Sequence, residues 1–273
     1  DDYHSLDRRQ RKALGITPLR PEANRLDLLA EHLEMLRRGL AIEKPVYDHA
    51  TGEIRGPVVF EPTPVIVVEG LHPFYTQELR DLSDFKIFVD PSRAVKRRWK
   101  LRRDVGERGY APEDVMREIL EREPDYKLYV DVQKVYAEAV VKIDDTRLRA
   151  SSILENPGER YSVRLIQEVL EAGPSAVDLT IDLSALFRLA EGEFSIAFQR
   201  DDYYGKRVSV LTVDGELHRS MVEGLEAKLQ ALAGSTGPIC DRAEGDRVTS
   251  TGMAQLLLSW RLLEKLQFHL AKA

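Results

Sequence analysis

Acidic and basic side chains crowd into the first eight residues of the chain, DDYHSLDR. A carboxylate there is of the type that takes up a proton, and His4 and Arg8 are of the types that hold an anionic substrate. Charge runs of this kind are also common in solvated loops. The spacing alone leaves both interpretations open.

A further acid, Glu69, follows four consecutive β-branched residues at positions 65–68. The uninterrupted run predicts a strand buried on both faces, as in a parallel sheet. Glu69 then emerges at the carboxyl edge, where ligands of open α/β sheets lie. In P-loop nucleotide sites, an acid at this position serves the Mg²⁺ bound to the phosphates. A surface glutamate after a strand is also common, so the pattern does not by itself assign this role.

Seven bases at positions 96–108 fall in a helix predicted to begin at residues 90–92 and to run to Arg108. A solvated helix face explains some of them. Lys100, Arg103 and Arg108 have i, i+3 and i+8 spacing, which lets them point one way along the helix and its exit. This subset predicts an anion site, most simply one for phosphate.

Tyr47 and His49 flank Asp48 in a segment that reads as extended. Alternate residues of an extended chain share a face, so the two rings are expected to lie together. Such a pair is either structural or part of the site.

The rest of the chain supplies elements that would position these side chains. Helices are predicted over residues 24–38, with Asn24 as its cap and Gly39 as its end, and over 79–82, 112–122, 221–232 and 253–270. A break is expected at 123–126. Strands are predicted over 85–90, 137–143, 177–183 and 208–213, with a loop at 203–206 and a turn at Asp214-Gly215. The expected fold is α/β: a mostly parallel sheet flanked by helices in residues 1–148, and an α+β extension with antiparallel strands in 149–273.

Composition limits the classes of protein that fit. The 273 residues are 43% hydrophobic and 32% charged, which is typical of globular proteins, and the net charge of −6 argues against general nucleic-acid binding. Neither a signal peptide nor a membrane-spanning run is expected. The single cysteine, Cys240, excludes an internal disulfide and fits a cytoplasmic location.

Three separated segments, residues 1–8, 44–52 and 69–73, together resemble the phosphoribulokinase family in order and spacing. Residues 103–109 and the motif Pro124-Asp125-Tyr126 extend the resemblance, which is close over residues 1–143 and looser through 212–215 and the final helix. The lid and substrate segments differ from those of the related uridine kinases.

The resemblance implies a P-loop kinase-like catalytic domain in residues 1–148. It also implies transfer of the γ-phosphoryl of ATP, with Mg²⁺, to the 1-hydroxyl of D-ribulose 5-phosphate. The product is ribulose 1,5-bisphosphate, as in carbon fixation by the Calvin cycle, and the enzyme is expected to be a homodimer. By matching position, Asp1 resembles the catalytic base and Glu69 the acid serving Mg²⁺. The other matched residues are the lid bases Lys100 and Arg103, the substrate-binding residues His4, Arg8, Tyr47 and His49, and the substrate-phosphate contact Arg108.

The sequence departs from the family in one respect. No match to the glycine-rich loop G-x-x-x-x-G-K-[ST] occurs in the 273 residues, so the sequence is interpreted as a fragment without its first strand and P-loop. The 273-residue chain alone is accordingly expected to lack ATP-dependent kinase activity. With one cysteine, thiol switching of the plant type is not expected. Two alternatives stay open: a nucleoside or pantothenate kinase-like enzyme, and a non-catalytic sugar-phosphate-binding paralogue.

Overall fold

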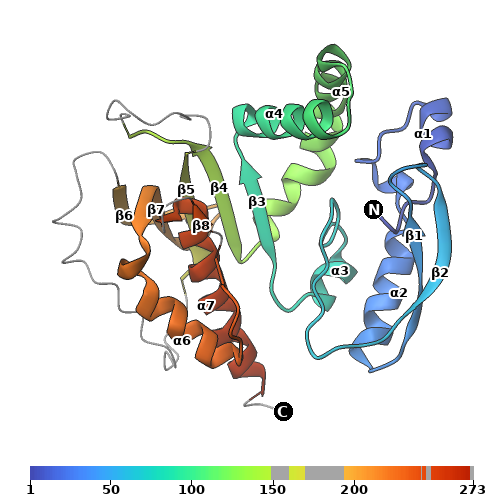
Figure 1. The fold of residues 1–273 in the computed structure, drawn as a ribbon. Helices are drawn as coiled ribbons and strands as arrows, with labels where there is room; N and C mark the ends of the chain where they lie inside the picture. The colour runs from blue at the N-terminus through green and yellow to red at the C-terminus, as the bar shows by residue number, and fades with distance from the viewer. Residues whose placement is uncertain (149–159, 170–193, 241, 244–246, 271–273) are drawn as a thin grey trace. The chain divides into compact units, whose positions relative to one another are not determined.

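The computed structural model describes residues 1–148, 160–169, 194–240, 242–243 and 247–270 (Figure 1). The chain forms two compact units. Unit 1 contains Asp1–Lys86 and Lys100–Ala137, and unit 2 contains Ile87–Trp99 and Glu138–Ala273. These two units do not coincide with the domains expected on either side of residue 148. The expected boundary concerns the catalytic domain and stays a prediction.

Unit 1 is built from helices and a two-stranded antiparallel hairpin. Its elements are α1 (Arg8–Leu14), α2 (Leu26–Arg37), β1 (Ile42–Tyr47), β2 (Ile54–Phe60), α3 (Gln77–Leu82) and α5 (Pro112–Asp125), with short helical turns at Pro21–Ala23, Arg102–Glu107, Tyr126–Val130 and Asp131–Tyr136. Helix α1 begins with a reciprocal capping box between Asp7 and Gln10 and ends at Gly15, which adopts the left-handed conformation.

Two details of the predicted helices are wrong. Arg25, not Asn24, precedes α2, because the Asn24 side chain bonds elsewhere. The expected break at residues 123–126 does not occur, since α5 runs through Pro124 to Asp125. A proline removes one helical hydrogen bond, and the wide π-type turn Tyr126–Val130 follows directly.

The β-branched run at residues 65–68 is not the buried strand that its composition predicted. It forms no strand in the described chain, and Val65 and Val67 are 48% and 82% exposed. Val68 instead packs against Leu29 and Leu79 of the small core of unit 1. A strand buried on both faces needs paired strands and two covering layers, and no strand of the described residues pairs with this segment.

Unit 2 is a sheet covered by helices. Its elements are β3 (Ile87–Pro91), most of α4 (Arg93–Leu101), β4 (Ala139–Asp145), β5 (Tyr161–Glu168), β6 (Phe194–Tyr203), β7 (Lys206–His218), α6 (Glu223–Ala233), β8 (Arg242–Ala243), β9 (Arg247–Thr249) and α7 (Ser250–Leu270). The strand order is β3-β4-β5-β7-β9-β8, and β6 also pairs with β7. Strands β3 and β4 are parallel and the other neighbours are antiparallel. The strand predicted over 177–183 lies outside the described residues.

Strand β7 passes straight through the turn that was predicted at Asp214-Gly215. Gly215 lies in the strand at φ 89° and pairs with Phe194, a conformation that glycine tolerates in strands. The Asp214 carboxylate is buried and accepts hydrogen bonds from Thr146 Oγ1 and the Arg147 backbone nitrogen. The actual β6–β7 turn is at Tyr204 and Gly205, both at positive φ, as the predicted loop at 203–206 anticipated.

The core of unit 2 lies between the sheet and helices α6 and α7 (Figure 1). Val163 and Leu165 of β5 contribute from the sheet, and Leu229 and Leu256 contribute from the two helices. Both leucines have no solvent exposure. Within the described residues, no helix combines the length and apolarity needed to cross a bilayer.

Leu229 and Leu232 of α6 provide a matched test of this core. We expect Leu229→Ala to lower the free energy of unfolding by about 2–5 kcal/mol, because it leaves a cavity among buried side chains. Leu232 is 38% exposed, so Leu232→Ala should cost much less. Urea unfolding followed by circular dichroism measures both, and equal losses would contradict this packing.

Candidate active site

The Asp2 carboxylate fastens the start of the chain to strand β1. It accepts a hydrogen bond from the Tyr47 backbone nitrogen at 2.8 Å and another from Lys44 Nζ. Burial opposes ionisation of Asp2, but these two hydrogen bonds and the Lys44 charge hold its pKa below the usual 3.8. Asp2 is thus engaged by the scaffold, whereas the Asp1 carboxylate is directed to different partners.

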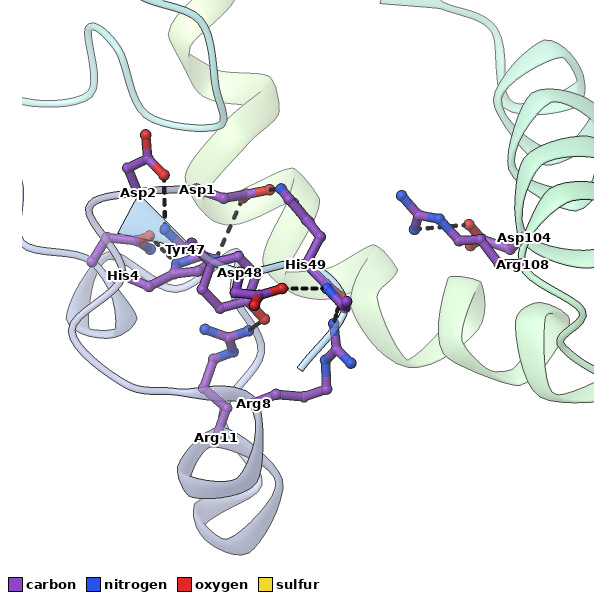
Figure 2. A network of polar contacts seen from close by, with 12 residues as sticks. Asp1, Asp2, His4, Arg8, Arg11, Tyr47, Asp48, His49, Asp104 and Arg108 are labelled. Carbon is purple, nitrogen blue, oxygen red and sulfur yellow. Dashed lines mark hydrogen bonds and ion pairs between the residues drawn. The ribbon is translucent and has the colours of Figure 1, made fainter. Parts of the chain in front are cut away.

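Asp1 lies between two histidines (Figure 2). Its Oδ1 is 3.4 Å from His4 Nε2 and its Oδ2 is 3.5 Å from His49 Nε2. His4 is buried, whereas the His49 side chain is 63% exposed. The carboxylate therefore bridges the protein interior and the solvent-facing loop after β1.

Tyr47 holds the two histidine rings in place. Its ring makes edge-to-face contacts with His4 at 5.0 Å and His49 at 5.1 Å between centroids. The Tyr47 hydroxyl accepts a hydrogen bond from Arg11 Nη2 at 2.9 Å, in a buried contact. The predicted sharing of one face by Tyr47 and His49 is confirmed.

Arg8 reaches the same loop from helix α1. Its Nη2 donates to the His49 carbonyl at 2.7 Å, and its backbone nitrogen donates to the Gly52 carbonyl at 2.9 Å. Gly52 has φ 79°, and a Cβ there would lie 2.6 Å from Arg8 Cβ. Only glycine allows this close approach, so the residue-52 turn and the Arg8 side chain are fitted to each other.

His4 is neutral at physiological pH. Burial, with the nearby Arg11 charge, lowers its pKa to about 4, despite hydrogen bonding that favours the protonated form. A neutral imidazole has one N–H donor and one nitrogen acceptor. His4 and Asp1 consequently do not form an ion pair at pH 7.

Asp1 and Glu69 line one cavity of about 280 Å³. Its wall is largely apolar, with Leu29 and Leu33 of α2 among the contributors. Within the described chain, no three His, Cys, Asp or Glu side chains are grouped to hold a metal. Mg²⁺ that is carried by substrate phosphates needs only one or two carboxylates from the protein, and Glu69 in the cavity lining could supply one.

The three predicted anion-binding bases converge on a buried acid. Asp104, which is 3% exposed, accepts from Arg103 Nε at 2.9 Å, pairs with Arg108 Nη1 at 3.2 Å and lies 3.1 Å from Lys100 Nζ. Lys100 also contacts Glu118 at 3.0 Å. Asp104 sits in the π-type turn Arg102–Glu107, whose wider coil brings the bases to one carboxylate.

The structure thus brings the predicted site residues together in two groups. Asp1, His4, Arg8, Tyr47 and His49 form the first group, and Lys100, Arg103 and Arg108 surround Asp104 in the second. Figure 2 shows Asp104 and Arg108 of the second group apart from the first. Sequence reasoning missed Asp104, Arg11 and Asn24. For Asp104, the available signal was its position four residues after Lys100 and four before Arg108.

Comparison with known proteins places the chain in a family. Residues 1–149 match the model of the phosphoribulokinase / uridine kinase family, and the chain belongs to this family. A phosphoribulokinase structure from Rhodobacter spheroides is similar at a TM-score of 0.51, with 16% identity over 96% of this chain and 86% of that one, which shows a shared fold. The α/β fold expected from the sequence is confirmed. The expected mostly parallel sheet is not found in the described residues, where only β3 and β4 pair in parallel.

Several curated relatives are named phosphoribulokinase, and two of them are 40% identical to this chain. The chloroplastic protein of Mesembryanthemum crystallinum is 40% identical over 80% of this chain, and the protein of Synechocystis is 40% identical over 79%. The chain spans 56% and 66% of their lengths. A uridine kinase of Chloroflexus aggregans is 39% identical, but over 44% of this chain and 58% of its own length.

Asp104 allows a test of how the basic group is held. Burial opposes ionisation of this carboxylate, but hydrogen bonds from Arg103 and Lys100 and their charges keep its pKa below the usual 3.8. A pKa lowered in the folded state adds stability above the unfolded pKa, and that stability is lost as pH falls through the folded pKa. We expect Asp104→Asn to reduce stability at pH 7, and this difference from wild type to shrink in acid.

Asp114→Asn is the matched control, because the Asp114 side chain is 63% exposed and pairs with Arg117 on the surface of α5. Its effect on stability should be small at every pH. Thermal melts between pH 7 and pH 3 compare the variants. A pH-independent loss in Asp104→Asn would exclude an ionised Asp104 as the centre of the group.

Proposed function

We propose that the protein phosphorylates the 1-hydroxyl of D-ribulose 5-phosphate with the γ-phosphoryl group of ATP, the reaction that feeds carbon fixation in the Calvin cycle. The observation that carries the proposal is the extent of the similarity. Relatives named phosphoribulokinase match about four fifths of the chain, whereas those named uridine kinase match less than half.

Asp1 is proposed as the general base. As the acceptor hydroxyl attacks the γ-phosphorus, its proton passes to the Asp1 carboxylate, and the bond from the γ-phosphorus to the bridging oxygen breaks to release ADP. Contacts with two histidines orient this carboxylate. Phosphoryl transfer depends mainly on positioning and charge stabilisation, so an oriented base beside a cavity suits it.

The basic residues of both groups are proposed to have two separate tasks. Arg8, His49 and Arg108 bind the phosphate of the sugar, while Lys100 and Arg103 stabilise the transferring phosphoryl group. Asp104 keeps Lys100, Arg103 and Arg108 close together without substrate, which lowers their mutual repulsion. Phosphate oxygens would then share donors that are already gathered.

Glu69 is proposed to serve the Mg²⁺ that accompanies ATP. It lines the same cavity as Asp1, and Mg²⁺ prefers oxygen ligands. The metal supplies charge neutralisation at the phosphates. Rescue of a Glu69→Gln variant by raised Mg²⁺ tests this role, and an unchanged metal dependence would count against it.

A homodimer and a cytoplasmic location are further proposals. Strand β6 pairs with β7, and with no other strand of the described residues, and its Phe198 is 63% exposed, so a second copy could cover this edge. A single cysteine fits a reducing compartment. Light scattering that finds only monomer would exclude the dimer, and cell fractionation tests the location.

Substrate selectivity tests the proposed function. In the protein expressed from the whole gene, we expect ATP-dependent phosphorylation of ribulose 5-phosphate and little activity on uridine or pantothenate. Calorimetry on the 273-residue chain should show binding of ribulose 5-phosphate but not of uridine. Preference for uridine would favour a nucleoside kinase, and sugar-phosphate binding without turnover in the whole protein would favour a non-catalytic binding protein.

The neighbouring carboxylates provide a second test. Asp1→Asn should lower kcat by about 10²–10⁴-fold while sugar and ATP binding persist, since the base acts as transfer begins. Asp2→Asn should mainly reduce stability, because it weakens the contacts with Lys44 and the Tyr47 nitrogen. Steady-state kinetics and thermal melts separate the two outcomes. A folded Asp2→Asn enzyme with the larger loss of kcat would transfer the role of base to Asp2.

A further inference from the structure

The side chain of Asn24 has a defined orientation. Its Nδ2 donates to the Pro18 carbonyl at 3.0 Å and to the Arg20 carbonyl at 2.8 Å. Carbonyl oxygens only accept hydrogen bonds, so the amide nitrogen must face them and Oδ1 must face the other way. That oxygen lies 2.8 Å from His4 Nδ1.

This orientation determines the tautomer of His4. The amide oxygen of Asn24 cannot donate, so His4 Nδ1 must carry the hydrogen of their shared bond. The neutral ring then has a lone pair at Nε2, the atom that faces Asp1 Oδ1 at 3.4 Å. A lone pair and a carboxylate oxygen cannot bond to each other directly, so both are available to a donor that enters between or beside them.

The turn that supplies the two carbonyls to Asn24 is itself bonded to the end of helix α5. Asp125 Oδ2 accepts from Thr17 Oγ1 at 2.7 Å and from Arg20 Nε at 3.1 Å, and its side chain is 8% exposed. These bonds fix the turn that supplies both carbonyls to Asn24. The motif Pro124-Asp125-Tyr126 thereby gains a structural connection to the site.

The backbone also keeps Asn24 and His4 side by side. The two residues form an isolated antiparallel bridge, with the Ser5 nitrogen bonded to the Ala23 carbonyl at 2.9 Å and the Arg25 nitrogen to the Tyr3 carbonyl at 2.7 Å. The contact between the two side chains is therefore built into the local fold.

We propose that Asn24 is a positioning residue that holds His4 in the Nδ1–H tautomer, so that His4 Nε2 accepts a hydrogen bond from a sugar hydroxyl next to the one that Asp1 deprotonates. This inference rests on the proposed function for the identity of the sugar. It assigns His4 to a hydroxyl rather than to the phosphate, because a nitrogen lone pair repels phosphate oxygens. The low pKa of His4 agrees with this neutral role.

The tautomer can be observed without catalysis. In the ¹⁵N-histidine-labelled 273-residue chain, long-range ¹H–¹⁵N spectra distinguish protonated from unprotonated ring nitrogens. Among the six histidines, the His4 signals are those that disappear in His4→Gln. At pH 7 we expect a protonated Nδ1 and an unprotonated Nε2. A protonated Nε2, whether in the other tautomer or in the imidazolium, would overturn the proposal.

Two substitutions separate orientation from general damage. Asn24→Ala removes the acceptor and should give a mixture of tautomers. Asn24→Asp places a charge beside Nδ1 and should raise the His4 pKa. The signals of His32 and His218 should stay in place in both variants, because their bonds to Tyr3 and Ser220 are not changed. An Asn24→Ala protein that keeps these control signals and still has only the Nδ1–H tautomer of His4 would also refute the proposed role of Asn24.

Kinetics test the role in sugar binding. In the protein from the whole gene, Asn24→Ala should raise the KM for ribulose 5-phosphate about two- to tenfold, as expected for one weakened neutral hydrogen bond, and leave the KM for ATP unchanged. If Asn24→Ala gives the expected mixture of tautomers but leaves the KM for the sugar unchanged, the proposed hydrogen bond between the sugar and His4 is excluded. If the protein has another substrate, the spectra still determine the His4 tautomer. Failure of the proposed function is therefore distinguishable from failure of the proposed role of Asn24.

Discussion

The hydrogen bonds from Lys44 and the Tyr47 backbone nitrogen to Asp2 set the geometry of the part of the candidate site around Asp1. They bind the first residues of the chain to strand β1, although more than forty positions separate the partners. Residues 1–4 form a turn closed by the hydrogen bond from the His4 backbone nitrogen to the Asp1 carbonyl, so fixing Asp2 on the strand places Asp1 beside His4. The two histidine rings, which Tyr47 contacts edge to face, then flank the Asp1 carboxylate.

A second constraint is the separation of charged from neutral groups. Asp104 gathers three bases near one buried carboxylate, so that part of the site stays cationic and ordered. His4 lies instead beside the Arg11 guanidinium in a buried position, and it is neutral. The sugar phosphate proposed as substrate carries both an anion and several hydroxyls, which correspond to these two kinds of protein surface.

Local patterns predicted most elements of the fold correctly. The spacing of leucines in α2, α6 and α7 is a property of the segment itself, and these helices lie where they were predicted, within two or three residues. The run at 65–68 was misjudged because burial of a strand depends on partners that its own composition does not specify. Asp214-Gly215 resembles a turn, but the neighbouring strands β5 and β6 keep it extended.

The site residues also divide into those that local patterns predicted and those whose role depends on partners brought by the fold. The types and spacing of the side chains around Asp1 and in the basic group pointed to an acid and an anion site, and the structure brings each group together. Asn24 and Asp104 were missed because a short polar side chain gains its role from its partners, and those partners come from the fold. For Asn24, a capping preference was the stronger local signal, and the bond to His4 replaced it.

The exposed valines at 65 and 67 affect how the 273-residue chain will behave in solution. Strand β2 is exposed along its whole length, and it includes Val58, Val59 and Phe60. Apolar, β-branched segments with unpaired backbone are templates for intermolecular strand pairing. At high protein concentration we therefore expect the chain to self-associate through these exposed segments.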